Sequence, residues 1–343
     1  CGIPYIDSVN RANDCRDFRF IGHPALPLSV NDYHVIFPDS ANILALATAY
    51  KLAPEVRWAR PDYYVELQFA PNDPYFAGVN EGVNCYQWNL DPTHCNFEKA
   101  WDITRGDTSV IIADVDNGFF YDHPDIKGNL WINRPEDRNG NGSFDSLPYP
   151  SGDLDSIDQD GNGFVDDVIG YNFPRSGPPN PKIPLDGHGT FTAGIAAAKT
   201  NDSMGVSGAA FNCRLMVVST TGLNPPGLVI SAIAQAVQYA TKMGPAVMNM
   251  SWVAPSDSQL ILAMDSAFAK NIVLVAGARN SPSGTADFPA TYSKVLGVAG
   301  VRKNDVKDPA SNYHDSLDLA CLHPRLVNTL QGISAAGHLQ LRL

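Results

Sequence analysis

The stretch SVIIADVD, residues 109–116, decides the fold, because it is short, almost wholly apolar and closed by an aspartate. Similar apolar runs recur after it, and amphipathic segments of helical period separate them. Continuous apolar strands that alternate with helices predict an α/β fold, a doubly wound parallel sheet with helices on both faces. The later strands are RLMVVST (214–220), AVMNMSW (246–252), NIVLVAGA (271–278) and KVLGVAGV (294–301), and the helices cover 188–199, 228–242 and 258–270.

The bulk composition narrows the class of protein. A chain of 343 residues is long enough for one large domain and a smaller one. An apolar fraction of 44% and a charged fraction of 17% are typical of a globular protein. The net charge of −12 argues against a nucleic-acid partner, whose phosphates need basic side chains. No run of 18 apolar residues predicts a membrane span. The first residue is Cys1 and not Met, so we expect either an N-terminus that has been processed or a fragment. A cysteine exposed by removal of a signal peptide could carry a lipid anchor.

Four polar residues stand where strands end or helices begin. Asp116 closes the first strand, His188 opens a helix, Asn280 follows the strand at 271–278, and Ser334 lies in GISAAGH near the C-terminus. In parallel sheets the carboxyl ends of the strands share one edge, and active sites form there. Acyl transfer needs a serine nucleophile, an imidazole that takes its proton, a carboxylate that orients the imidazole, and a donor for the oxyanion.

The motifs around these residues resemble those of the subtilases, the subtilisin-like serine peptidases. DNGFFYDHPDI resembles the D-T-G…H-P-D-L segment of that family, and GHGTFTAGIAAA resembles G-H-G-T-H-V-A-G. VMNMSW resembles the strand that pairs with substrate, GARN resembles A-A-G-N, and GVSGAA and DLACLHPRLVNTL also match. The resemblance implies a secreted or cell-surface serine endopeptidase that acts on protein or peptide substrates. It assigns Ser334 as nucleophile, His188 as general base, Asp116 as the orienting acid and Asn280 as the oxyanion donor.

Three features of the sequence qualify this assignment. Asp114 is a competing acid, but counting back from HPD places Asp116 in register with the family's acid, and Asp114 where an apolar residue is usual. Arg279 replaces the glycine before the oxyanion asparagine. The motif at Ser334 lacks one residue, and the sequence ends nine residues later, as in a truncated or degenerate C-terminus. The alternative is therefore a catalytically inactive subtilase-like binding protein or a fragment. A Rossmann-type nucleotide site is disfavoured, because DNGFF lacks the G-x-G-x-x-G pattern.

The N-terminal third resembles a subtilase propeptide that runs into the mature enzyme, at LALATAYKLAPEVRWARPDYYVELQFAPNDPYF. We expect residues 1–76 to form an extension with a small α+β propeptide-like segment, 77–108 to be a linker with the start of the mature enzyme, and 109–343 to be the catalytic domain with an incomplete last helix. In the family the propeptide covers the active site until it is cleaved, so the chain's own propeptide is the expected inhibitor.

Local patterns in this N-terminal part predict two helices and two strands. The segments 41–53 and 97–103 favour helices. The segments VRWA (56–59) and YYVELQF (63–69) have strand character.

Two Asp-rich segments, EDRNGNGSFD (136–145) and DQDGNGFVDD (158–167), lie between the Asp and His motifs. Oxygen side chains at positions 1, 3, 5 and 9, with glycines at 4 and 6, suit a hard cation, although neither segment has the Glu at position 12 of a full EF-hand. The alternative is a cluster of turns without metal. We expect structural calcium, more strongly at the second segment. The candidate ligands are Asp158, Asp160, Asn162, Asp166 and Asp167, with Asp137, Asn139, Asn141 and Asp145 in the first segment.

Overall fold

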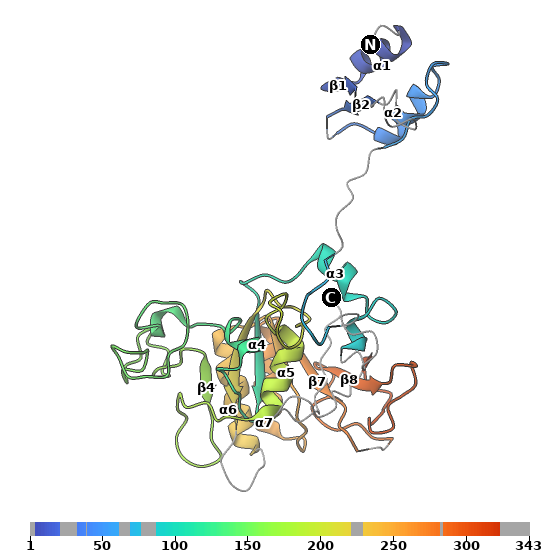
Figure 1. The fold of residues 1–343 in the computed structure, drawn as a ribbon. Helices are drawn as coiled ribbons and strands as arrows, with labels where there is room; N and C mark the ends of the chain where they lie inside the picture. The colour runs from blue at the N-terminus through green and yellow to red at the C-terminus, as the bar shows by residue number, and fades with distance from the viewer. Residues whose placement is uncertain are drawn as a thin grey trace. The chain divides into compact units, whose positions relative to one another are not determined.

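The computed structural model describes residues 4–20, 33–38, 40–61, 69–76, 87–220, 229–281 and 284–322. The chain divides into two compact units, residues 1–67 and 68–343. Figure 1 shows both units coloured along the chain.

The first unit is an α+β arrangement, as the sequence indicates. Its two strands pair antiparallel, with Phe18 opposite Val35. One side of each helix is buried in a common core, where Ile6 of the first helix and Leu46 of the second lie with Phe37. The segment 56–59 forms no strand, which corrects the prediction for VRWA, and residues 62–68 lie outside the described part. The elements are α1 (Pro4–Ala12), β1 (Asp17–Phe20), β2 (Tyr33–Ile36) and α2 (Ile43–Tyr50).

The second unit contains a seven-stranded sheet in the order β4-β5-β3-β6-β7-β8-β9. Every neighbouring pair of strands in it is parallel. From β3 the sheet grows through β5 to β4 on one side and through β6 to β9 on the other, so the winding reverses next to β3. The strands are β3 (Ile111–Asp116), β4 (Gly170–Asn172), β5 (Arg214–Ser219), β6 (Val247–Met250), β7 (Val273–Gly277), β8 (Leu296–Val301) and β9 (Leu319–Leu322).

Helices cover both faces of this sheet, which confirms the predicted doubly wound α/β fold (Figure 1). Ala113 and Val115 of β3 belong to the core that includes α6 and α7. Ile112 belongs to the core on the opposite face, which α5 covers. Because side chains alternate along a strand, Asp114 and Asp116 point to the same face as Ile112, toward α5. The helices are α3 (Phe97–Ile103), α4 (Pro124–Lys127), α5 (Gly187–Ala197), α6 (Ile230–Met243) and α7 (Ser258–Ala269), with short 3₁₀ turns η1 (Trp88–Leu90) and η2 (Arg134–Glu136).

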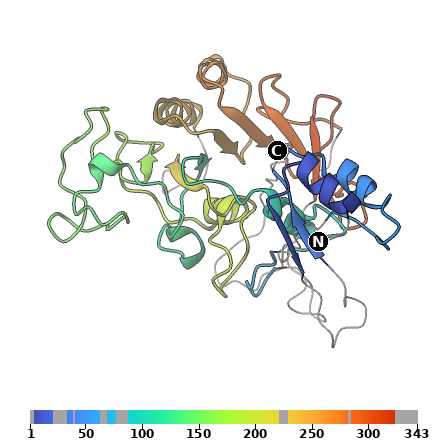
Figure 2. The same ribbon diagram turned by 90° about the horizontal axis from the view of Figure 1, so that it is seen from above.

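Two loop regions frame the sheet. The Asp-rich segments lie in loops that project beyond β4, as the green part of the chain in Figures 1 and 2 shows. The second region joins the segment around Asp73 to the loop that follows α5. Asp73 is fully buried. Its carboxylate accepts hydrogen bonds from the backbone N–H of Asn201 at 2.9 Å and from the Ser207 hydroxyl at 2.7 Å. Within the described residues, no helix combines the length and the apolar character that crossing a membrane requires.

Candidate active site

Asp116 and His188 meet at the carboxyl edge of the sheet. Asp116 is the last residue of β3, and His188 is the second residue of α5. The imidazole Nδ1 lies 2.8 Å from each carboxylate oxygen of Asp116. Asp116 is 3% exposed, whereas the His188 side chain is 29% exposed. The buried carboxylate therefore binds one nitrogen of the ring, which fixes the tautomer and leaves Nε2 as the proton acceptor.

Glycines allow the start of α5 to approach the end of β3 this closely. A Cβ on Gly189 would lie 2.3 Å from the carbonyl oxygen of Gly118 and 3.0 Å from Cβ of Asp116. A Cβ on Gly118 would lie 2.2 Å from the carbonyl oxygen of Pro184, in the segment that leads into α5, so a side chain at either glycine would push these segments apart. Asp186 caps the helix, because its carboxylate accepts from the His188 N–H at 2.7 Å. The motifs GHGT and DNG thus place the histidine beside the aspartate.

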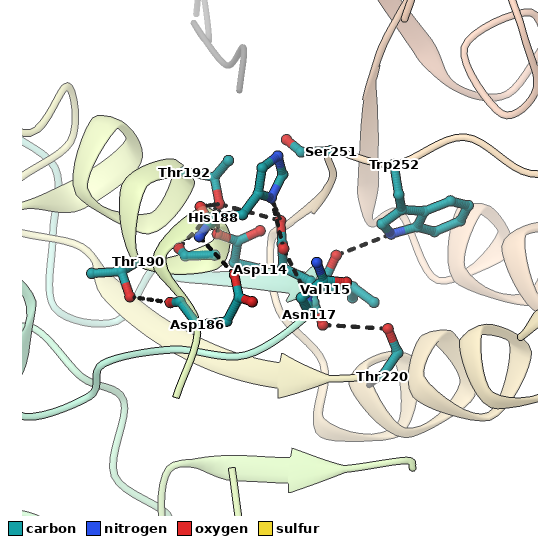
Figure 3. A network of polar contacts seen from close by, with 12 residues as sticks. Asp114, Val115, Asn117, Asp186, His188, Thr190, Thr192, Thr220, Ser251 and Trp252 are labelled. Atoms are coloured by element: carbon teal, nitrogen blue, oxygen red, sulfur yellow. Dashed lines mark hydrogen bonds and ion pairs between the residues drawn. The ribbon is translucent and has the colours of Figure 1, made fainter. Parts of the chain in front are cut away.

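Asp114 lies next to this pair. No hydrogen bond among the described residues joins it to the imidazole. The Thr192 hydroxyl lies 2.7 Å from its Oδ2, and the Asn249 side-chain amide donates to its Oδ1 at 2.8 Å. Figure 3 shows Asp114 and Thr192 beside His188. Burial, and then the charge of Asp116, raise the pKa of Asp114 to about 8. In the described residues His188 Nδ1 thus contacts Asp116, whereas Asp114 contacts Thr192 and Asn249.

Asn280 lies in the loop that follows β7, at the same edge of the sheet. The loop is held by Asn312, which is 1% exposed. Asn312 donates its backbone N–H to the Arg279 carbonyl at 3.0 Å and accepts from the Ser281 N–H at 2.9 Å. Arg279 itself has φ +80°, a left-handed conformation that favours glycine, and its guanidinium pairs with Asp287 at 2.8 Å. The arginine thus has a backbone conformation that a glycine would adopt more readily.

Ser334 lies outside the described residues, which end at 322. Its assignment as the nucleophile remains a prediction from the sequence.

The second Asp-rich segment contributes to a cluster of three carboxylates. Glu136, Asp160 and Asp167 each offer an oxygen, and these oxygens all lie within 4.8 Å of one another. Burial is the largest cause that raises the pKa of Glu136 to about 7 and that of Asp167 to about 6. The Asn162 amide donates to Asp160 at 3.0 Å and to Asp167 at 3.1 Å, so it lies between two of the three acids. Carboxylates gathered in this way suit a hard cation.

The other expected ligands lie around this cluster or apart from it. Asp158 accepts from the N–H groups of its own loop, with Gly163 N at 2.7 Å. Asp166 accepts from the Asp155 N–H at 2.9 Å. In the first segment Asn139 and Asn141 both donate to Asp145, and Asp137 accepts from two glycine N–H groups. Among the described residues, three acids lie close enough together to share a cation only at Glu136, Asp160 and Asp167.

The sequence matches the Subtilase family over residues 107–328. The chain belongs to this family. A thermophilic serine proteinase of Bacillus sp. strain AK1 is 28% identical over 334 residues, which cover 96% of this chain and 71% of that protein. Thermitase of Thermoactinomyces vulgaris is 31% identical over 253 residues, 74% of this chain and 73% of thermitase. This subtilase is a serine-type endopeptidase by these relationships.

A solved structure supports the subtilase fold. A protease from Pseudoalteromonas arctica superposes with a TM-score of 0.56 at 23% identity, over 74% of this chain and 72% of that chain. At this identity the likeness concerns the fold alone, and it agrees with the seven-stranded parallel sheet.

Sequence reasoning missed several residues that this subtilase uses to build its site. Glu136 is the first residue of the segment 136–145, one position before the oxygen pattern that begins at Asp137, and folding brings it to the second segment. Asn312 lies in ASNYHD, where nothing marks it as the clamp of the Asn280 loop. In the sequence, Thr192 and Asn249 stand only as parts of the motifs GHGTFTAG and VMNMSW. The sequence does contain one signal for Thr192 and Asn249. Asp114 is polar at a position where the family resemblance implies an apolar residue, so it needs polar partners.

Proposed function

We propose that this subtilase hydrolyses internal peptide bonds through an acyl-enzyme, with Ser334 as nucleophile, His188 as acid and base, Asp116 as orienter and Asn280 as oxyanion donor. The observation that carries the proposal is the contact of the Asp116 carboxylate with His188 Nδ1 at 2.8 Å. It lies at the carboxyl edge of a parallel sheet, next to the point where the winding reverses.

Each residue then has a defined task. His188 Nε2 takes the proton of the Ser334 hydroxyl while the serine oxygen bonds to the carbonyl carbon of the peptide. The Asn280 side chain donates to the oxyanion that forms. His188 passes the proton to the leaving amine, and the peptide C–N bond breaks. A water molecule then releases the acyl group by the same steps, and Asp116 stabilises the imidazolium throughout.

The experiment is hydrolysis of an unfolded protein substrate, with the products sequenced to locate the cleaved bonds. We expect new N-termini inside the substrate, and Asp116→Asn to lower kcat about 10⁴-fold, as the same change does in the well-studied Ser-His-Asp proteases. Asp315→Asn is the matched control, because Asp315 is an exposed aspartate outside the triad. Equal hydrolysis by Asp116→Asn and the unaltered chain would refute the proposal.

The rival proposal is a catalytically inactive subtilase that binds peptides without cleaving them. Arg279 favours it, because a bulky cation replaces glycine next to the oxyanion donor, and misplacing that donor forfeits roughly 3 kcal/mol of transition-state stabilisation. The altered motif around Ser334 favours it too. Retention of an intact peptide, without any cleavage, would support this rival.

We also propose that calcium binds the cluster of Glu136, Asp160 and Asp167, with Asp158, Asn162 and Asp166 around it. Supporting this, the carboxyl oxygens of the three acids lie within 4.8 Å of one another, and two of the acids are buried. The ion would remove the repulsion among these acids and brace the insert, without a part in the chemistry. The first segment, with Asp137, Asn139, Asn141 and Asp145, stays a weaker candidate.

The test of calcium binding is thermal stability with and without a chelator. At a calcium concentration about 100 times Kd, binding stabilises the folded state by about 3 kcal/mol, so the melting temperature should fall when the chelator is added. An unchanged melting temperature in excess chelator would refute a structural ion.

We propose, finally, that the N-terminal part acts as a propeptide and that the enzyme works outside the cytoplasm. The compact α+β unit supports a segment that folds separately from the catalytic unit. Purified residues 68–343, the second compact unit, should be inhibited when a separate polypeptide of residues 1–67 is added. Absence of inhibition would refute the propeptide role, and recovery of the enzyme only from the cytoplasmic fraction would refute secretion.

A further inference from the structure

Two carboxyl groups lie on the same face of β3, and the triad uses only one of them. Asp114 and Asp116 are two residues apart, so both point toward α5. Asp114 is 1% exposed and Asp116 is 3% exposed. The Thr192 hydroxyl lies between them, 2.7 Å from Asp114 Oδ2 and 3.5 Å from Asp116 Oδ2. Two ionised carboxylates in so small a buried space would repel each other strongly, so the pair favours sharing one proton.

The contacts decide which of the two acids holds the proton. Asp116 receives the imidazole N–H of His188 at 2.8 Å and the Asn117 N–H at 2.6 Å, both of which favour a carboxylate. Asp114 has only uncharged neighbours in hydrogen-bond contact within the described residues, the Thr192 hydroxyl and the Asn249 amide. A buried acid without a cation beside it stays neutral.

The proton has a defined place on Asp114. The Asn249 side-chain nitrogen can only donate, and it lies 2.8 Å from Oδ1. The proton therefore belongs on Oδ2, from which it is donated to the Thr192 oxygen at 2.7 Å. The hydroxyl hydrogen of Thr192 then has three acceptors within reach: Asp116 Oδ2 at 3.5 Å and, nearer, the carbonyl oxygens of His188 at 3.4 Å and Gly189 at 3.1 Å. The negative charge of the Asp116 carboxylate makes it the strongest acceptor of the three.

We propose that Asp114 is a positioning residue for the triad, a neutral acid that holds Asp116 in place through the Thr192 hydroxyl. This inference rests on the proposed function, because Asp116 is its target. The resemblance to the family implies an apolar residue at position 114, so the family pattern does not account for this acid. It also gives Thr192, one turn after His188 on α5, a task that an apolar residue could not perform.

The groups that face Asp114 set its response to pH. They are Asp116 on its own strand, His188 and Thr192 on α5, Asn249 on β6 and the paired Val217 on β5. Among these, Asp116 and His188 titrate. Because the pKa of Asp114 is raised to about 8, first by burial and then by Asp116, the acid is neutral at pH 7 and ionises above pH 8. A second negative charge then appears beside Asp116 and disturbs the triad.

The test compares Asp114→Asn, Asp114→Val, Thr192→Val and Thr192→Ser in the full chain. Asparagine presents an N–H to Thr192 as the neutral acid does, so Asp114→Asn should keep kcat within about twofold at pH 7. Asp114→Val and Thr192→Val break the link, and we expect kcat to fall about 10- to 100-fold while KM stays within about twofold. Thr192→Ser keeps the hydroxyl and should retain most of the activity.

The pH profile separates positioning from a merely structural role. The kcat/KM of the unaltered enzyme should decline above about pH 8, and that of Asp114→Asn should not. Full activity with an unaltered pH profile in both Val variants would overturn the proposal. So would a loss in Asp114→Asn as large as in Asp114→Val, because that result would require a charge at position 114.

A measurement without catalysis keeps this test separate from the proposed function. In protein labelled with ¹³C at the aspartate carboxyl carbons, the signal that disappears in Asp114→Asn should titrate near pH 8, and it should titrate at lower pH in Asp116→Asn. If the signal titrates like an ordinary exposed aspartate, the proposal is wrong whatever the activity. If it titrates near pH 8 in a chain that cleaves nothing, the proton assignment is supported and the peptidase is refuted.

Discussion

The substitution Asp114→Asn should stabilise the folded protein, and the gain should grow with pH. In the folded state burial and the neighbouring charge of Asp116 raise the pKa of Asp114 from 3.8 to about 8. At a pH between these two pKa values, Asp114 holds a proton in the folded protein but has released it in the unfolded chain. Stability therefore falls as pH rises through this window, by a little over 1 kcal/mol per pH unit, because unfolding releases that proton.

Asparagine has nearly the same shape and does not titrate, so it removes this dependence. The difference in unfolding free energy between Asp114→Asn and the unaltered chain should be small near pH 4. It should then increase by roughly 5 kcal/mol up to pH 8 and stay level above it. The neutral acid and the amide make the same contacts with Thr192, which is why little difference is expected at low pH.

The assay is urea denaturation at several pH values between about 5 and 9, with a linear extrapolation of the unfolding free energy at each. Both proteins should carry Ser334→Ala, so that self-digestion does not disturb the equilibrium. The matched control is Asp315→Asn, because Asp315 is exposed. A difference that is independent of pH, or one that shrinks as pH rises, would refute the reasoning that Asp114 is neutral in the folded state.

Three further substitutions test other parts of the structure. Arg279→Gly relieves the strain of a left-handed backbone at φ +80° and removes an exposed ion pair. Urea denaturation should therefore show a net increase in unfolding free energy of up to about 1 kcal/mol. A decrease would contradict the strain. Gly189→Ala places a Cβ 2.3 Å from the Gly118 carbonyl oxygen and should destabilise the fold by about 1–3 kcal/mol. As a control, the Cβ of Gly194→Ala in the same helix meets nothing within 4 Å, so this change should be neutral or stabilising. Equal effects of the two changes in urea denaturation would contradict this reasoning. Glu136→Gln should reduce the calcium-induced rise in melting temperature, and an undiminished rise would exclude Glu136 from the site.

Periodicity predicted the five central strands and the three long helices of the second unit, because these elements carry apolar side chains that the core buries, but it did not predict the edge strands β4 and β9. The helix expected at 228–242 is α6, Ile230–Met243, and the strand expected from 109 is β3, Ile111–Asp116. The prediction failed for VRWA, whose side chains have strand propensity but find no partner strand in the described structure. The prediction included no helix at α1, whose nine residues bury Ile6 and Val9.

The site was predictable where short motifs contain it and not where distant segments meet. Asp116 and His188 stand in motifs whose glycines force the close approach that the structure shows. Glu136 joins Asp160 and Asp167 from outside the repeated Asp-rich pattern, so spacing alone could not include it. The contact between Asp114 and Thr192 depends on which side chains of β3 face which turn of α5. Only the packed structure shows this.

The most direct test of the central claim is labelling with a fluorophosphonate, which reacts with a serine only when an imidazole activates it, followed by mass spectrometry to find the modified residue. If Asp116, His188 and Ser334 form a working triad, one label per chain should appear on Ser334, and His188→Ala should abolish it. Absence of any label, or a label that survives Ser334→Ala, would contradict the account.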